Sequence, residues 1–161
     1  MNIAMASDKA GFDLKESVRL YLLEQGHQVT DWGQQAPDQP GVPFYEGCCA
    51  VIREIQSGRA EKGILFCSSG AGMCILANKF EGIYAIVSES VYSAKYCRII
   101  NDCNVLTMGQ RMIGSAMAFE MVDAFLSTDF MQGMTPERQV YQTNLIDNFK
   151  QLEKKLYHPE T

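Results

Sequence analysis

The segment that decides the fold is residues 63–72, Gly-Ile-Leu-Phe-Cys-Ser-Ser-Gly-Ala-Gly. Its first half, Gly63 to Cys67, is almost continuously apolar, which is typical of a central strand buried on both faces of a parallel sheet. The second half, Ser68 to Gly72, is small, polar and rich in glycine, and it predicts a tight turn. A helical pattern from Met73 to Lys79 follows, so the segment predicts a strand, a turn and a helix in succession.

Short apolar runs alternate with longer helical patterns on both sides of this segment. Strands are also predicted at 1–7, 28–32, 84–87 and 105–108, and helices at 12–25, 44–57, 90–100, 114–127 and 135–156. Residues 34–43 contain three prolines and predict a surface loop. Strands separated by helices indicate βαβ units. Residues 1–161 are therefore expected to form one α/β domain, with a mostly parallel sheet covered by helices on both faces.

Composition restricts the class of partner. The chain has 161 residues and a mass of 18.0 kDa, which is the length of one domain. Its 14 lysines and arginines against 19 acidic residues give a formal net charge of −5. A negative field repels polyphosphates, which argues against nucleic acid and anionic membranes as partners. A small anionic substrate stays compatible, because a few local cations outweigh a modest and distant net charge.

Cysteine and histidine usage predicts the compartment and the need for metal. The six cysteines form no C-x-x-C pair, and the N-terminus carries no pattern of a secretory leader. No apolar stretch approaches the roughly 18 residues that span a bilayer. A cytoplasmic protein with reduced thiols and no membrane association is therefore expected. The two histidines, His27 and His158, lie far apart in the sequence, so neither a metal site nor another cofactor is expected.

Candidate functional residues follow the predicted strands, because open parallel sheets bind ligands outside the carboxyl ends of their strands. Asp8 and Lys9 follow the first strand, and Arg111 follows the last. Asp8 is equally suited to binding substrate hydroxyls and to capping the next helix. Lys9, Arg111 and Arg138 are candidate clamps for an anion, although an isolated surface cation is by default only solvated.

The turn at 68–72 is the most informative of these segments. Its two glycines let several backbone N–H groups converge beside the positive end of a helix, where they could hold a phosphate or an enediolate oxygen. The turn is not a phosphate-binding Walker loop, because no Lys-Ser or Lys-Thr follows Gly72. It is also a poor dinucleotide fingerprint, because it lacks a third glycine and follows the third predicted strand. The alternative interpretation is a tight connection without function.

Cys67 ends the central strand beside this turn. A thiol at a helix N-terminus forms its thiolate more readily, so Cys67 could act as a nucleophile or as a base towards a carbon-bound proton. The alternative is a buried structural cysteine. That structural interpretation is favoured for the other five, which are Cys48, Cys49, Cys74, Cys97 and Cys103.

Three stretches resemble the ribose-5-phosphate isomerase B and galactose-6-phosphate isomerase family. They are Ser-Asp-Lys-Ala-Gly-Phe at 7–12, Gly-Ile-Leu-Phe-Cys-Ser-Ser-Gly-Ala-Gly-Met at 63–73, and Asn-Asp-x-Asn-Val-Leu-x-x-Gly-x-Arg at 101–111. The resemblance covers about residues 1–130. It implies a Rossmann-like, three-layer α/β/α sandwich that works as a dimer or a pair of dimers. It also implies metal-independent interconversion of aldose and ketose phosphates through a cis-enediol.

The resemblance also implies residue roles. Cys67 would move a proton between C1 and C2, Ser69 would move one between the two oxygens, and backbone N–H groups of the turn would stabilise the enediolate. Arg111 is expected to reach the phosphate from the neighbouring subunit, so that active sites lie at a subunit interface of a homodimer or homotetramer. The C-terminal helix, 135–156, is expected to pack on that partner. The implied substrate-binding residues are Asp8, Lys9, Ser68, Gly70, Ala71, Gly72, Met73, Asn101, Arg111 and Arg138.

The chain departs from the family pattern at positions that in the family contact the sugar phosphate. Lys9 stands where the ribose isomerases have histidine, Ile100 replaces their ring-opening histidine, Gly41-Val42 replaces Asp-Tyr, and Met134 replaces one of two phosphate arginines. Because Ile100 cannot transfer a proton, we expect a mostly acyclic substrate such as a tetrulose 4-phosphate. A keto-uronate is also acyclic, but the remaining arginines favour a phosphate.

Two other functions fit the same residues. The chain could be one subunit of a heteromeric galactose-6-phosphate isomerase, or a sugar-phosphate-binding protein that has lost turnover. Retention of Cys67 together with the turn favours an isomerase that acts alone.

Overall fold

The computed structural model describes residues 1–159 and contains one five-stranded sheet. The strands are β1 (Asn2–Ser7), β2 (Gln28–Asp31), β3 (Lys62–Cys67), β4 (Ala85–Val87) and β5 (Val105–Gly109). Their order is β2-β1-β3-β5-β4, and every pair is parallel. The predicted sheet is thus confirmed, with no antiparallel member among the described residues.

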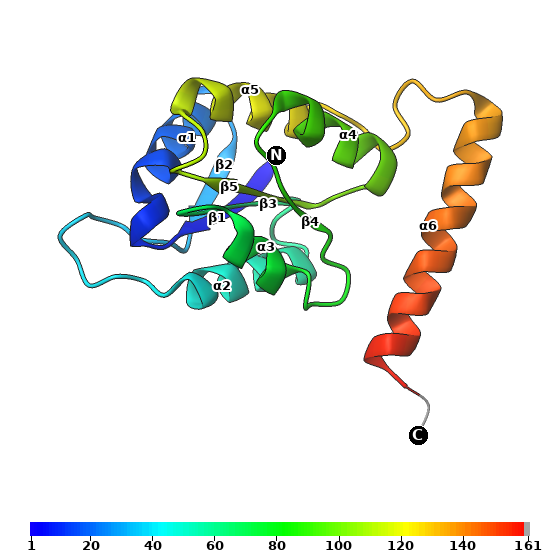
Figure 1. Ribbon diagram of the computed structural model, residues 1–161, viewed down its shortest axis with the longest axis horizontal. Helices are drawn as coiled ribbons and strands as arrows, with labels where there is room; N and C mark the ends of the chain where they lie inside the picture. The colour runs from blue at the N-terminus through cyan, green and yellow to red at the C-terminus, as the bar shows by residue number, and fades with distance from the viewer. Residues whose placement is uncertain (160–161) are drawn as a thin grey trace.

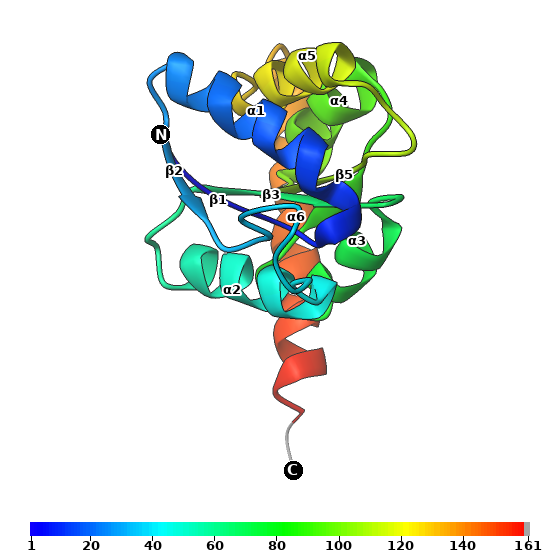
Figure 2. The same cartoon turned by 90° about the vertical axis from the view of Figure 1, so that its left-hand side faces the viewer.

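Helices cover both faces of the sheet, which confirms the three-layer α/β/α arrangement. They are α1 (Phe12–Glu24), α2 (Phe44–Gln56), α3 (Ala71–Ala77), α4 (Val91–Asn101), α5 (Ser115–Leu126) and α6 (Pro136–Tyr157), with a 3-10 turn η1 at Lys9–Gly11. Figures 1 and 2 show α1, α4 and α5 on one face of the sheet and α2 and α3 on the other.

Two apolar clusters hold these layers together. Ile64 and Phe66 are fully buried in the cluster on the α1, α4 and α5 side. Leu65 is fully buried in the cluster on the α2 and α3 side. Burial on both faces explains the continuous apolar run of β3, because alternate residues of a strand point to opposite faces. Within residues 1–159, no helix is long and apolar enough to cross a membrane.

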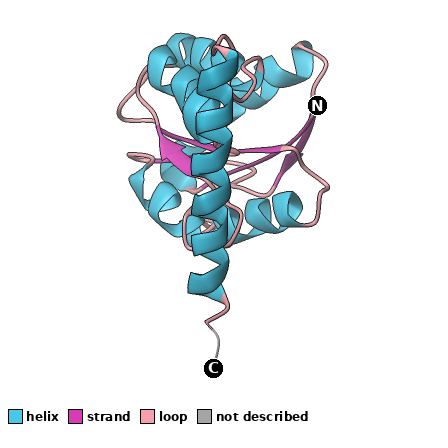
Figure 3. Ribbon diagram, turned by 90° about the vertical axis from the view of Figure 1, so that its right-hand side faces the viewer, coloured by secondary structure: helices cyan, strands magenta, loops and turns pink. Residues whose placement is uncertain are grey.

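Helix α6 stands apart from the other helices, across the β4 edge of the sheet, and extends beyond the α2–α3 layer (Figures 1 and 3). It contacts the body through Gln142, which donates to the Ile100 carbonyl at 2.7 Å, and through Phe149, whose ring lies 5.4 Å from that of Tyr84. Much of its apolar surface is exposed, namely Val140, Tyr141, Leu145, Leu152 and Leu156.

Candidate active site

The candidate site lies where β1 and β3 end side by side. The chain crosses from β1 to β2 on one side and from β3 to the outer strands on the other, which makes this a topological switch point. Ser7 pairs with Phe66 and Cys67 pairs with Gly109 at the carboxyl ends of the strands. Asp8, Cys67 and the residues after Gly109 are therefore carried to one edge of the sheet.

The Cys67 sulfur lies against the turn that follows it. Its Sγ accepts a hydrogen bond from the Gly70 N–H at 3.1 Å. The residue keeps 7% of its surface exposed, whereas Phe66 before it has none. The next residues along the turn, Ser69 and Ala71, are exposed. Cys67 is thus a buried residue of the apolar cluster on the α2 and α3 side, and it lies directly before turn residues that are open to solvent.

The turn presents backbone donors to that surface. The Ala71 N–H lies 3.4 Å from the Ser69 Oγ, and the first helical bond of α3 runs from the Cys74 N–H to the Gly70 carbonyl at 3.1 Å. The N–H groups of Gly72 and Met73 find no acceptor in the part of the chain that the structure describes. Unsatisfied donors at a helix start are suited to an anionic oxygen.

Gly70 in the turn and Gly109 at the end of β5 allow the turn to pack closely against the sheet. Gly70 has a φ of +80°, and a Cβ there would lie 2.9 Å from Val87 Cγ2 and 3.0 Å from the Met108 carbonyl carbon. A Cβ on Gly109 would lie 2.7 Å from the Ser69 Cα. The left-handed Gly70 also lets α3 begin at Ala71, two residues before the predicted start.

Replacing Gly70 with alanine is expected to lower the free energy of unfolding by about 2–4 kcal/mol, because positive φ strain and backbone overlap add. Gly58→Ala is the matched control, since Gly58 has a φ of +74° but nothing within 4 Å of the added Cβ. It should cost only about 1 kcal/mol. Urea denaturation measures both values, and equal losses would show that the turn is not tightly packed.

Asp8 acts as a cap in this structure. Its Oδ1 accepts from the Gly11 N–H at 3.0 Å and caps η1, as the capping interpretation expected. Partial burial raises the pKa of Asp8, although backbone hydrogen bonds from Gly11 and Ala10 act in the opposite direction. Only Oδ1 is used by the cap, so binding of a substrate hydroxyl by the same carboxylate remains a prediction.

The 34–43 loop lies beside Lys9, and its conformation is held by Gln34, a residue that the sequence analysis did not single out. Gln34 is fully buried, donates to the Ala36 carbonyl at 2.5 Å and accepts from the Val42 N–H at 2.9 Å. It thereby fixes the 34–43 loop against Lys9, whose Cβ lies 3.8 Å from a Cβ built on Gly41. In the sequence, Gln34 is one polar residue among others after Gly33, and nothing there indicates that its side chain is buried and holds the loop.

Phe44, at the end of this loop, was also missed. Its ring atoms lie 3.8 and 3.9 Å from a Cβ built on Gly72, so the ring borders the backbone donors of the turn. The ring is partly exposed and makes an edge contact with Tyr45 at 5.7 Å between centroids.

The backbone of Arg111 contacts the turn of its own chain. Its backbone N–H donates to the Ser68 carbonyl at 3.1 Å, and the Gln110 N–H donates to the Cys67 carbonyl at 3.0 Å. Arg111 therefore lies beside the turn of its own chain. Its side chain is exposed, and the expectation that it reaches the phosphate of a neighbouring subunit's site stays a prediction.

Asn101 and Arg138 lie elsewhere. Asn101 ends α4 just before β5 begins, at the Gly63 end of β3, and Cys67 lies four residue steps further along that strand. At about 3.3 Å per residue this is about 13 Å. Asn101 lines a cavity of about 350 Å³ together with Tyr84 and Phe149. Arg138 opens α6, one turn before the Gln142 that bonds Ile100. We call Asp8, Cys67, the 68–72 turn and Arg111 the first cluster. We call Ile100, Asn101 and Arg138 the second cluster, because Asn101 follows Ile100 and Arg138 lies one helical turn before the residue that bonds Ile100.

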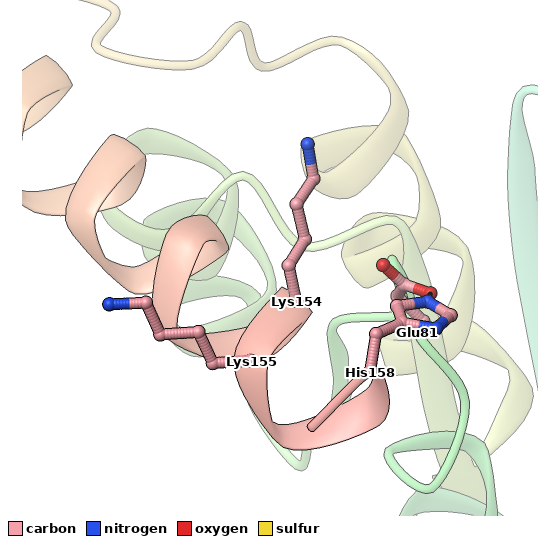
Figure 4. Close-up of a pocket in the computed structure, with 4 residues that line it drawn as sticks. All are labelled: Glu81, Lys154, Lys155 and His158. Carbon is pink, nitrogen blue, oxygen red and sulfur yellow. Dashed lines mark hydrogen bonds and ion pairs between the residues drawn. The ribbon is translucent and has the colours of Figure 1, made fainter. Parts of the chain in front are cut away.

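Another pocket contains none of the predicted residues. It has a volume of about 720 Å³ and is lined by Glu81, Lys154, Lys155 and His158. Figure 4 shows His158 against Glu81, with 2.9 Å between Nε2 and Oε2, while the two lysine side chains point apart. This pocket lies at the C-terminal end of α6, and none of the residues that line it belongs to the site around Cys67.

Cys48 and Cys103 are buried thiols outside the turn. All six cysteines are free. Burial raises the pKa of Cys48 to about 12, which leaves it protonated and unreactive at neutral pH. Cys103 has a raised pKa because it hydrogen-bonds the Cys97 thiol inside the core. Within residues 1–159, no group of three or more histidine, cysteine or acidic residues is arranged to hold a metal ion.

Residues 3–142 match the profile described as ribose/galactose isomerase. The chain belongs to this family. Sequence relatives include a 4-deoxy-4-sulfo-D-erythrose isomerase from Clostridium sp. (strain MSTE9), 43% identical over 157 residues, which is 98% of each chain. A D-erythrulose-4-phosphate isomerase from Pectobacterium atrosepticum is 36% identical over 137 residues, covering 83% of this chain and 87% of its own.

Solved structures agree with the assignment. The ribose-5-phosphate isomerase B of Clostridium thermocellum superposes with a TM-score of 0.86 at 31% identity, over 97% of this chain and 99% of the other. The Rossmann-like fold and the family expected from the sequence are therefore confirmed. Family membership makes the protein a sugar-phosphate isomerase, an intramolecular oxidoreductase that interconverts an aldose and a ketose. The roles of individual site residues remain predictions.

Proposed function

We propose that the protein isomerises a four-carbon sugar carrying an anionic group on C4, through a cis-enediol and without a metal. The observation that carries this proposal is the Cys67 sulfur placed against the backbone donors of the 68–72 turn. A base beside preorganised donors is what proton transfer next to a carbonyl requires.

The proposed reaction balances as a proton shift. The Cys67 thiolate removes the proton from C2 of the aldose, and the C–H electrons form the C1–C2 double bond while the carbonyl electrons move to O1. Backbone N–H groups of Gly72 and Met73 stabilise the enediolate oxygen. The Ser69 hydroxyl passes a proton from O2 to O1, and the Cys67 thiol returns its proton to C1 to give the ketose.

The substrate length follows from Ile100 and from the two relatives. Ile100 cannot give or take a proton, so the enzyme is suited to a sugar that needs no ring opening. The relatives' names specify a four-carbon sugar with sulfonate on C4 and a four-carbon sugar with phosphate on C4. A blocked C4 prevents a furanose ring in both. The expectation of a phosphate is thereby widened to a terminal anion, held by Lys9, Arg111 and Arg138.

A complete site requires two copies of the chain in this proposal. Asn101 and Arg138 lie with Ile100, remote from Cys67 of the same chain. The exposed apolar side of α6 supplies a surface for a second copy, which is the role expected of the C-terminal helix predicted at 135–156. An isologous dimer would bring the second cluster of each copy to the Cys67 cluster of the other. The free thiols support placing this dimer in the cytoplasm.

The proposal is tested with the purified chain alone. The substrates are 4-deoxy-4-sulfoerythrose, erythrose 4-phosphate, ribose 5-phosphate and galactose 6-phosphate. We expect kcat/KM for at least one four-carbon substrate to exceed that for ribose 5-phosphate by about 100-fold, the scale of a missing general acid. Comparable turnover of ribose 5-phosphate would contradict the proposal. Activity only with a second, unlike chain would support a heteromeric subunit, and binding without turnover would support a non-catalytic protein.

A further inference from the structure

Thr107 lies in β5 beneath the turn and is fully buried. Its Oγ1 donates to the Gly70 carbonyl at 3.0 Å. The same carbonyl accepts from the Cys74 N–H at 3.1 Å, so it is fixed from the sheet and from α3 at once. Thr107 has no surface from which it could touch a substrate. Any effect that it has on the reaction must therefore be indirect, and Gly70 is the residue of the turn that its hydroxyl holds.

The peptide groups on either side of Gly70 explain how such an effect would arise. The N–H of Gly70 donates to the Cys67 Sγ at 3.1 Å. The carbonyl of Gly70, held by Thr107, shares its peptide plane with the N–H of Ala71. Because a trans peptide is planar, its carbonyl and N–H point in opposite directions. A carbonyl anchored in the core therefore directs the Ala71 N–H towards the exposed side of the turn.

Gly70 is also the residue whose backbone most needs such an anchor. It sits at a φ of +80°, and without a Cβ it has access to more conformations than any other residue type. A shift of its two peptide groups would misalign both the donor to Cys67 and the donors of the turn. Amide donors contribute to catalysis only when they are held in place before the reaction.

We propose that Thr107 is a positioning residue for proton transfer. Its hydroxyl holds the Gly70 peptide so that the turn keeps its donors aimed at the thiolate and at the enediolate. This inference rests on the proposed function, because it assigns Thr107 a role in the same site.

The test compares Thr107→Val, which removes the hydroxyl and keeps the shape, with Thr107→Ser, which keeps the hydroxyl. Loss of a whole oxyanion donor costs about 10²–10³ in kcat, and a misaligned donor keeps part of that effect. We therefore expect Thr107→Val to lower kcat by about tenfold with KM within about twofold, and Thr107→Ser to restore kcat to within about twofold of the unmodified enzyme. Thr128→Val is the control, since Thr128 is another buried threonine, located after α5 and outside the site.

The outcomes separate the inference from the proposed function. An unmodified chain that turns over no four-carbon substrate overturns both. An active chain whose kcat is unchanged in Thr107→Val, or whose loss lies in KM alone, overturns only the role of Thr107. A loss that Thr107→Ser does not restore also overturns it. If Thr107→Val does not fold, as judged by circular dichroism, Thr107→Ala removes the same hydroxyl with less apolar bulk and is judged by the same kcat criterion.

Discussion

Replacing Cys67 with alanine is expected to lower kcat by about a thousandfold, the scale of a lost general base, while substrate binding survives. Alanine removes the sulfur that accepts the Gly70 N–H but leaves the backbone of the turn in place. Binding depends on that backbone and on the cations around it, so the dissociation constant should change by less than about fivefold. Initial rates and calorimetric titration with the best four-carbon substrate measure the two quantities.

Cys49→Ala is the matched control for this prediction. Cys49 lies in α2 and is only partly buried, and no side-chain hydrogen bond places it in the site. Its replacement should leave kcat within about twofold. If Cys67→Ala kept most of its activity, another group would have to be the base. If both variants lost activity equally, the effect of Cys67→Ala would reflect folding rather than catalysis.

Heterodimers with one damaged cluster in each copy are expected to regain about half of the activity of the unmodified dimer. Cys67→Ala damages the first cluster, and Arg138→Ala damages the second. Each homodimer then has two defective sites. In the heterodimer, one site combines both lesions, and the other combines an intact first cluster with an intact second cluster. Co-expression with two different affinity tags, followed by purification over both, isolates the heterodimer for assay.

Arg111→Ala supplies the control for this experiment. The backbone of Arg111 lies beside Ser68 of its own chain, so Cys67 and Arg111 belong to the same cluster. A heterodimer of Cys67→Ala with Arg111→Ala should therefore stay as inactive as its parents. Activity in this control together with none in the Arg138 combination would reverse the proposed grouping. No recovery in either combination would show that each site is built from one chain.

The strands and the central turn were predictable because their causes are local. A run such as Gly63 to Cys67 has few alternatives to a buried strand, and two glycines after it leave few alternatives to a tight turn. The short η1 was not predicted, because three residues of 3-10 helix carry no periodic signal. The early start of α3 was not predicted either, because it depends on the positive φ of Gly70.

The composition of the site was less predictable, because it depends on distances across the fold. Asn101 occurs in a family motif next to β5, but its helix runs back across the sheet and leaves it at the opposite edge from Cys67. The alternation of strands and helices contained that information, since a helix after a parallel strand returns to the starting edge. Gln34 and Thr107 gave no such signal. The roles given to them here come from hydrogen bonds to backbone atoms far along the chain or across a loop.

The central claim is that the Cys67 sulfur carries a proton to and from carbon. Its most direct test is proton NMR of the best four-carbon substrate in D₂O. With the unmodified enzyme, a thiol that exchanges with solvent between removal and return of the proton should deliver deuterium to C1 of the ketose and to C2 of the recovered aldose. With Cys67→Ala at equal site occupancy, exchange at both positions should be about a thousandfold slower than with the unmodified enzyme. Exchange by Cys67→Ala at the unmodified rate would contradict the assignment of the base.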